Sequence, residues 1–144
     1  MRALAHGLGL VLLLAAVASA QAVPAFNITR LYRTEAEFTR AIQPYQQAIA
    51  ANARNARAHH WLGIAYLTAY RQSQIGAAPY AGGYVPRAIA SLREAISADP
   101  NLTGAYLALH DAYKITGEDA KANAVLDQML QRSRPEWLPP VGIR

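Results

Sequence analysis

The sequence predicts an all-α fold in which antiparallel helix–turn–helix repeats stack as a short α-solenoid. The stretch from Ala41 to Asn52 is repeated at 88–99, and a looser copy starts at Ala122. The first two copies share, in the same order, Ala, Ile, a bulky apolar residue, Ala, Ile, Ala and a final Asn or Asp. Apolar residues in each copy recur every three or four positions, as on one face of a helix. Self-similarity at a fixed period is typical of arrays whose units bury their apolar faces against their neighbours.

The repeat has a period of 34 residues, and one copy carries 13 extra residues. Three positions return 47 residues later, namely Leu62, Gly63 and Tyr66 as Leu109, His110 and Tyr113. Three others return 34 residues later, namely Ala88, Leu92 and Ala95 as Ala122, Leu126 and Met129. The difference places an insertion near 73–86, a stretch rich in Gly, Pro and Tyr, as expected of a surface loop.

Five main helices are expected, near 35–52, 56–72, 86–98, 102–115 and 119–133. Thr34 and Glu37 form a capping-box pattern that begins the first helix, and Pro44 inside that helix removes one backbone hydrogen bond and should kink it. Pro100 ends the third helix because proline disfavours helical geometry in the residue before it. The turn at 116–119 separates the last two helices.

Both flanks lie outside this repeat domain, which we predict over residues 34–134. Met1-Arg2, an apolar run from Leu8 to Val17 and the small residues at 18–20 predict a signal peptide over 1–20, cleaved near Ala20–Gln21. A retained N-terminal anchor is the alternative, although the run is about half the ~20 residues of a membrane-spanning helix, so we expect no transmembrane segment in the mature chain.

The segments directly beside the domain are predicted to be non-helical. Residues 21–33 lack periodicity and contain Pro24, so we expect an extended or degenerate segment there. The tail at 135–144 is rich in proline and cannot form a helix. Three alternatives stay open for this tail: Trp137 and Leu138 cap the last unit, the face of that unit is an oligomer contact, or the tail is a proline-rich ligand.

Composition limits the class of protein. The chain has a net charge of +5 and no cysteine, which excludes disulfides and a lipid-attachment cysteine. Eight arginines face two glutamates between residues 21 and 93. They are dispersed at helical spacing, which favours a solvated basic face over a nucleic-acid site. An Ala- and Arg-rich chain with such a signal looks bacterial, so we expect export to the periplasm or the extracellular space.

The recurring residues carry a family resemblance. Leu62-Gly63-x-x-Tyr66 is followed in order by Ala88, Leu92, Ala95, Pro100, Tyr106, Leu109, Tyr113, Gly117, Ala122 and Leu126. This pattern resembles the tetratricopeptide repeat (TPR) family over Ala56–Arg134 and reaches back over Phe38–Asn55 as the second helix of a preceding unit. The resemblance implies a right-handed α-solenoid of about 2.5 TPR units.

In that family the first helix of each unit lines a concave groove that takes extended peptides or a partner helix. The resemblance therefore implies a partner-binding groove lined by Arg57, His60, Trp61, Ile64, Leu67, Leu107, Asp111 and Lys114. This lining is largely apolar with an aromatic anchor, which suits apolar peptide segments. Alternatively, Trp61 and Ile64 pack against the insertion or a neighbouring helix.

Tyr80 and Tyr84 in the insertion are further candidates for partner contact. Loops that combine Tyr with Gly give adaptable binding surfaces with a large contact area. Equally, the insertion lies over the groove and fills it with its own tyrosines. The sequence leaves both alternatives open.

No constellation predicts catalysis or metal binding. His59 and His60 point about 100° apart on a helix, and no carboxylate or cysteine stands beside them at ligand spacing. No serine is marked as activated, and no Gly-rich phosphate loop is present. We therefore predict an exported, non-catalytic protein–protein interaction scaffold without cofactor, metal or nucleic-acid partner. The alternative is a structural self-association module of an envelope complex, and a homo-oligomer fits either.

Overall fold

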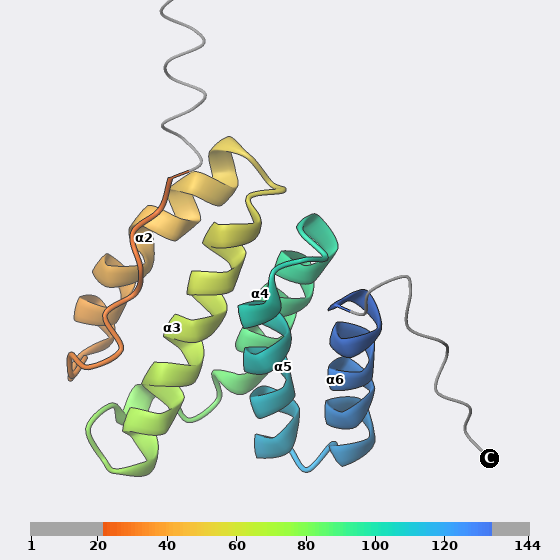
Figure 1. Cartoon of the computed structure of the whole chain (residues 1–144). Coiled ribbons are helices and arrows are strands. Elements are labelled where there is room, and N and C mark those ends of the chain that lie inside the picture. The colour runs from red at the N-terminus through yellow and green to blue at the C-terminus, as the bar shows by residue number, and fades with distance from the viewer. Residues whose placement is uncertain (1–21, 134–144) are drawn as a thin grey trace, which may run out of the picture.

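The structure is a computed structural model that describes residues 22–133, and these residues form five α-helices, one short 3-10 helix and no strand (Figure 1). The helices are α2 (Glu35–Ala51), α3 (Ala56–Gln74), α4 (Val85–Ala98), α5 (Thr103–Ile115) and α6 (Asp119–Ser133), with η1 (Pro79–Ala81) inside the insertion. The predicted all-α class and its five main helices are confirmed, and every helix end lies within two residues of its expected position. The predicted signal peptide and proline-rich tail lie outside the described residues.

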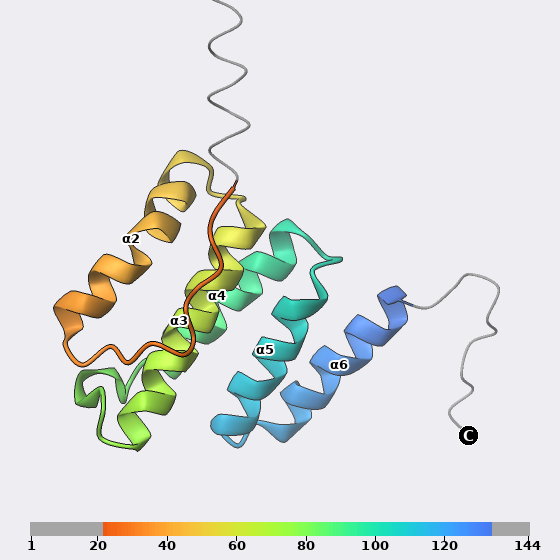
Figure 2. The same cartoon turned by 60° about the vertical axis from the view of Figure 1, so that its left-hand side comes forward.

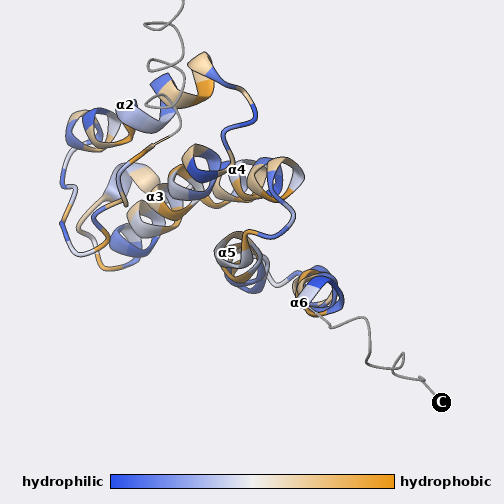
Figure 3. Ribbon diagram, turned by 45° about the horizontal axis from the view of Figure 1, so that its top comes forward, coloured by the Kyte–Doolittle hydropathy of each residue, from blue (hydrophilic) through white to orange (hydrophobic). Residues whose placement is uncertain are grey.

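The helices stack in chain order as a TPR-like α-solenoid. α3 packs against α4 and α5 packs against α6, which makes two helix pairs, and α4 packs against α5 to join them. α3 also contacts α5 directly, and α2 packs against α3 as the second helix of a preceding unit. Figure 3 shows α6 outermost at one side of the stack, beyond α5.

Local sequence explains where the helices begin and end. The Thr34 hydroxyl accepts a hydrogen bond from the Glu37 backbone N–H, and the Glu37 carboxylate accepts one from the Thr34 N–H, so the predicted capping box is present. Asn55 caps α3 by accepting from the Ala58 N–H. Gly117 has a φ of 73°, the left-handed geometry that suits glycine in the turn after α5.

Small residues bring α3 and α4 close together. Ala65, Ala69, Ala88 and Ala95 are fully buried, and Leu92 is buried among them. A Cβ atom placed on Gly63 would lie 2.5 Å from Leu92 Cγ, so only glycine fits at this point. The pair of helices is therefore packed too closely to accept a larger side chain on this part of α3.

Residues 22–34 are not helical and run as an extended segment beside α2 and α3 (Figure 2). Phe26 and Tyr32 from this segment are buried, with their rings stacked 5.1 Å apart. Gln72 of α3 holds the backbone: its Nε2 donates to the Arg30 carbonyl at 2.7 Å, and its Oε1 accepts from the Tyr32 N–H at 2.9 Å. The segment thus occupies the place beside α2 and α3 where the repeat symmetry would put the first helix of the preceding unit.

The insertion completes the same part of the core. An aromatic cluster forms from the N-terminal segment, α2, α3 and the insertion, and its members are Phe26, Tyr32, Phe38, Tyr45, Tyr66, Tyr80 and Tyr84. The Tyr80 hydroxyl donates to the Tyr32 carbonyl at 2.9 Å, and the Tyr84 hydroxyl donates to the Glu35 carboxylate at 3.2 Å. These bonds fasten the insertion to the N-terminal segment and to the start of α2.

Candidate partner-binding surface

The outward faces of α3 and α5 form one continuous surface, which we call the α3–α5 face. Two contacts join the helices. The His60 ring packs against Gly104, where an added Cβ atom would lie only 3.2 Å from His60 Nε2, and Arg71 Nη2 lies 3.2 Å from Asp111 Oδ2. Ile64 lies between the two contacts on α3, and Leu107 lies between them on α5. The helices are thus held side by side along this face, with apolar side chains in its middle.

Most of the predicted groove residues are accessible on this face. Leu107 is 50% exposed, although a side chain of its kind normally avoids water. Trp61 and Ile64 are partly buried against the core, and the Trp61 ring lies 4.9 Å from the His60 ring. Leu67 differs, because it is only 2% exposed and belongs to the core. Leu107 and five other predicted groove residues are therefore exposed or partly exposed on this face, and Lys114 lies farther along α5.

The charged side chains of the face are unequally engaged. Asp111 pairs with Arg71 and lies 3.5 Å from His110 Nδ1. Lys114 Nζ lies 2.5 Å from Oδ1 of Asp119, the first residue of α6. Arg57 is exposed and forms no ion pair with any carboxylate in the part of the chain that is described. Arg57 is therefore the charge on this face that is most available to a partner.

His60 is the titratable group most embedded in the face. Burial lowers the pKa of its imidazole below the usual range, and a hydrogen bond with the Gly104 backbone opposes that shift only in part. The ring is therefore neutral at physiological pH and packs α3 against α5. This packing role gives no sign of acid–base chemistry.

The structure places Tyr80 and Tyr84 away from the α3–α5 face. Tyr84 is buried and Tyr80 is partly buried, and both rings pack against Phe38 in the aromatic cluster. Burial, together with the neighbouring Tyr84, Glu35 and Glu37, raises the pKa of Tyr80 to about 12. The described contacts of these tyrosines are internal, but they lie with Tyr32, Glu35 and Phe38, so the tyrosines do not fill the predicted groove.

Two residues of this region were not anticipated from the sequence. Gln72 continues the buried stripe of α3 that runs through Leu62, Ala65 and Ala69, and a polar residue on such a stripe is a signal for a buried hydrogen bond. Arg71 has no such signal, because its partner Asp111 is 40 residues away in sequence.

Sites of other kinds are few in the described chain. Residues 22–133 contain no group of three or more His, Asp or Glu side chains placed to hold a metal ion. Among the described helices, none combines the length and apolar character that crossing a membrane requires.

Comparison with known proteins supports the repeat assignment. A family model described as TPR repeat matches residues 30–69, which span the end of the N-terminal segment, α2 and most of α3. No curated protein matches the chain. Repeats of this family generally mediate protein–protein interaction, and the family is typically non-catalytic. Residues 30–69 are therefore similar to a tetratricopeptide repeat, and the stacked antiparallel helix pairs that follow are consistent with a TPR-like α-solenoid.

Proposed function

We propose that this protein is an exported, non-catalytic scaffold that binds an apolar peptide segment or a partner helix on the α3–α5 face. The observation that carries the proposal is Leu107, half exposed beside Ile64 and Trp61 on a face made by the first helices of two units. Burying a leucine of this kind against a partner contributes roughly 1.5–3 kcal/mol when burial is complete. Trp61 would serve as the aromatic anchor typical of such contacts.

The charges of the face suggest how a partner is oriented. Arg57 stands at the start of α3 and Lys114 near the end of α5. Since Asp111 is paired with Arg71 and Lys114 is paired with Asp119, Arg57 is the charge that an approaching segment meets without a competing ion pair. A partner with an apolar centre and an acidic residue near the start of α3 would therefore fit best.

Site-specific photo-crosslinking tests this surface. A photoreactive phenylalanine analogue at Leu107 should crosslink a partner, while the same analogue at Ile75, which is also exposed, should not. Leu107→Glu should weaken binding of the crosslinked partner at least tenfold. Leu130→Glu is the matched control, because Leu130 is a comparably exposed leucine on α6. Equal weakening by both variants, or equal crosslinking from both positions, would overturn the proposal.

Export rests on the N-terminal sequence. The charged start, the apolar run and the small residues before Gln21 support a cleaved signal peptide. N-terminal sequencing of the protein recovered outside the cytoplasm should give a chain that starts at Gln21. Recovery of only the uncleaved chain in the cytoplasm would contradict export.

A second candidate function, self-association, is favoured by the outermost helix. Leu130 on α6 is 60% exposed, and Leu126 and Met129 beside it are partly exposed. An uncovered end of a repeat stack is a ready contact for a second copy. Sedimentation velocity over a wide range of concentrations should then show a dimer that Leu130→Glu disrupts, whereas a monomer at every concentration argues against it.

A further inference from the structure

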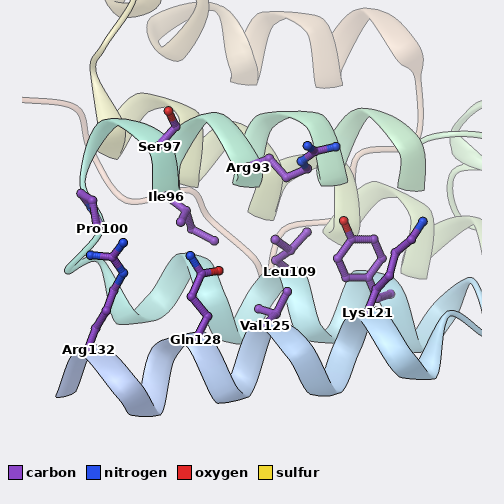
Figure 4. Close-up of a pocket in the computed structure, with 10 residues that line it drawn as sticks. Arg93, Ile96, Ser97, Pro100, Leu109, Lys121, Val125, Gln128 and Arg132 are labelled. Carbon is purple, nitrogen blue, oxygen red and sulfur yellow. The ribbon is translucent and has the colours of Figure 1, made fainter. Parts of the chain in front are cut away.

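A second type of groove occurs twice on the molecule, at equivalent positions of successive repeats. Between α2 and α4, above α3, lies a groove of about 390 Å³ that we call the α2–α4 groove. Between α4 and α6, above α5, lies a groove of about 610 Å³ that we call the α4–α6 groove (Figure 4). Both lie between second helices of the units, on the side away from Leu107.

The repeat offsets show that the two grooves are copies. The lining residues Gln46, Ile49, Ala50 and Leu62 of the first groove correspond, 47 residues later, to Arg93, Ile96, Ser97 and Leu109 of the second. Ser91 and Glu94 correspond, 34 residues later, to Val125 and Gln128. The apolar floor is therefore kept between the copies, while the polar rim is not.

The difference in the rims is one of charge. The α2–α4 groove is lined by one carboxylate, Glu94, and by no Lys or Arg. The α4–α6 groove is lined by Arg93, Lys121 and Arg132 and by no carboxylate. Two copies of one structural feature have thus diverged into a nearly neutral groove and a basic one.

The positive charge of the α4–α6 groove is largely uncompensated within the described chain. Lys121 pairs with Glu118, whereas Arg93 and Arg132 form no ion pair with any described carboxylate. The hydrogen bond to Glu118 raises the pKa of Lys121, and the charge of Arg93 opposes that effect, so these two cations lie close enough to repel. Like charges held together over an apolar floor are stabilised by an incoming anion.

The arrangement of the cations indicates the shape of the ligand. Figure 4 shows Arg93 toward the Lys121 end of the groove and Arg132 at the other end, with Ile96, Leu109 and Val125 between them. Lys121 and Arg132 are eleven residues apart on α6, which is roughly 16 Å along a helix axis. An extended peptide covers that distance in about five residues.

We propose that the α4–α6 groove is a second docking site, for a partner segment with acidic residues at both ends of a short apolar run. Residues 134–144 of this chain are a poor occupant, because they carry two arginines and one glutamate. Charge complementarity therefore favours a segment of another protein. The site is independent of the α3–α5 face, so one scaffold holds two partners at once.

A peptide titration followed by NMR tests the proposal. The probe is a peptide with two glutamates, four leucines or alanines and two further glutamates, and the comparison peptide has glutamines in place of the glutamates. The acidic probe should shift the backbone amides of Arg93, Val125 and Gln128, while the equivalent residues Gln46, Ser91 and Glu94 stay unmoved. The glutamine peptide should bind at least tenfold more weakly.

Charge-matched variants complete the experiment. Arg93→Glu combined with Arg132→Glu should weaken binding of the acidic probe at least tenfold, with an unchanged circular dichroism spectrum. Arg33→Glu combined with Arg40→Glu changes the net charge equally on exposed residues elsewhere and should leave the affinity within twofold. The shifts at Arg93, Val125 and Gln128 themselves distinguish this site from the α3–α5 face. Absence of binding by the wild type, or equal losses in both double variants, would overturn the proposal.

Discussion

Gly63 sets the distance between α3 and α4, because its missing side chain leaves room for Leu92. Leu92 is fully buried, and its Cγ and Cδ2 would lie 2.5 and 2.7 Å from a Cβ atom on Gly63. Real Cβ atoms are not found that close to a neighbour. A single hydrogen atom at this position therefore determines how closely the two helices of one unit pack.

Gly63→Ala should lower the free energy of unfolding by about 1–3 kcal/mol, because the methyl group overpacks the α3–α4 contact. Urea unfolding measures the change. Gly82→Ala is the matched control: Gly82 has a φ of −57° and open space around its Cα, so alanine there should change stability by less than about 0.5 kcal/mol. A stable Gly63→Ala protein would mean that Leu92 can move aside.

His60 should make stability depend on pH. Burial lowers its pKa in the folded state, so the unfolded state binds more protons as the pH falls through about 6.5. The free energy of unfolding should therefore fall as the pH is lowered through that value, by at most about 1.4 kcal/mol per pH unit and by less because the ring is only partly buried. Unfolding from about pH 7.5 to 5.5 should show a shallower slope for His60→Gln.

At the scale of the element, the N-terminal segment behaves as part of the fold although it has no secondary structure of its own. Its buried aromatic residues and its two hydrogen bonds to Gln72 hold it against α2 and α3. The Asn27 side chain accepts hydrogen bonds from the Thr29 and Arg30 backbones and shapes the turn before Tyr32. An extended chain thus supplies the burial that a helix supplies elsewhere in the repeat.

Gln72→Leu should loosen this segment without changing the helices. The substitution leaves the Tyr32 N–H and the Arg30 carbonyl without their partner, at a cost of about 1–3 kcal/mol for the buried Tyr32 N–H. Hydrogen exchange at the Tyr32 amide should become at least tenfold faster. Gln74→Leu, on the exposed side of the same helix, should not alter that rate. Unchanged protection in Gln72→Leu would show that the aromatic contacts alone hold the segment.

The helices were predictable from sequence, whereas the segment's position was not. The helices follow from apolar spacing, from the Thr34–Glu37 capping box and from the break at Pro100, all of which are local signals. The Gln72 side chain bonds to residues about 40 positions away in the sequence. It contacts only their backbone atoms, so the side chains of Arg30 and Tyr32 give no sequence signal for this contact. Local patterns specify elements well, and long-range backbone contacts leave no pattern.

The candidate surface was partly predictable, because its residues follow the local repeat pattern of α3. Family resemblance selects the outward face of α3, and Arg57, Trp61 and Ile64 are found there. From Ile64 that face continues through Arg71, two helical turns on, while Leu67 turns into the core because the helix has 3.6 residues per turn. The charge difference between the two grooves was present in the sequence, but only the fold shows which residues line equivalent places.

At the scale of the whole molecule, stability should be graded along the stack. α3 has nine buried residues and neighbours on several sides, whereas α6 has only Ala122 and Val125 buried among its described residues and packs on α5. In repeat arrays each unit is stabilised by its nearest neighbours, so the outermost helix should open first.

Native-state hydrogen exchange should therefore protect the amides of α3 and α4 most and those of α6 least, with opening free energies that differ by about 2 kcal/mol or more. Mass spectrometry of peptides from each helix measures the gradient. Uniform protection from α3 to α6 would mean that the stack unfolds as one cooperative unit.

The 13 extra residues and the non-helical segment at 22–34 occupy one part of the stack together. Tyr80 and Tyr84 from the insertion meet Tyr32, Glu35 and Phe38 at the place that the repeat would give to a helix. Shortening the insertion to the regular 34-residue repeat would remove the tyrosines and leave a cavity there. Adding a regular helix in front of α2 would produce a steric clash with the same tyrosines. A variant with the regular repeat must therefore change the insertion and the N-terminal segment together.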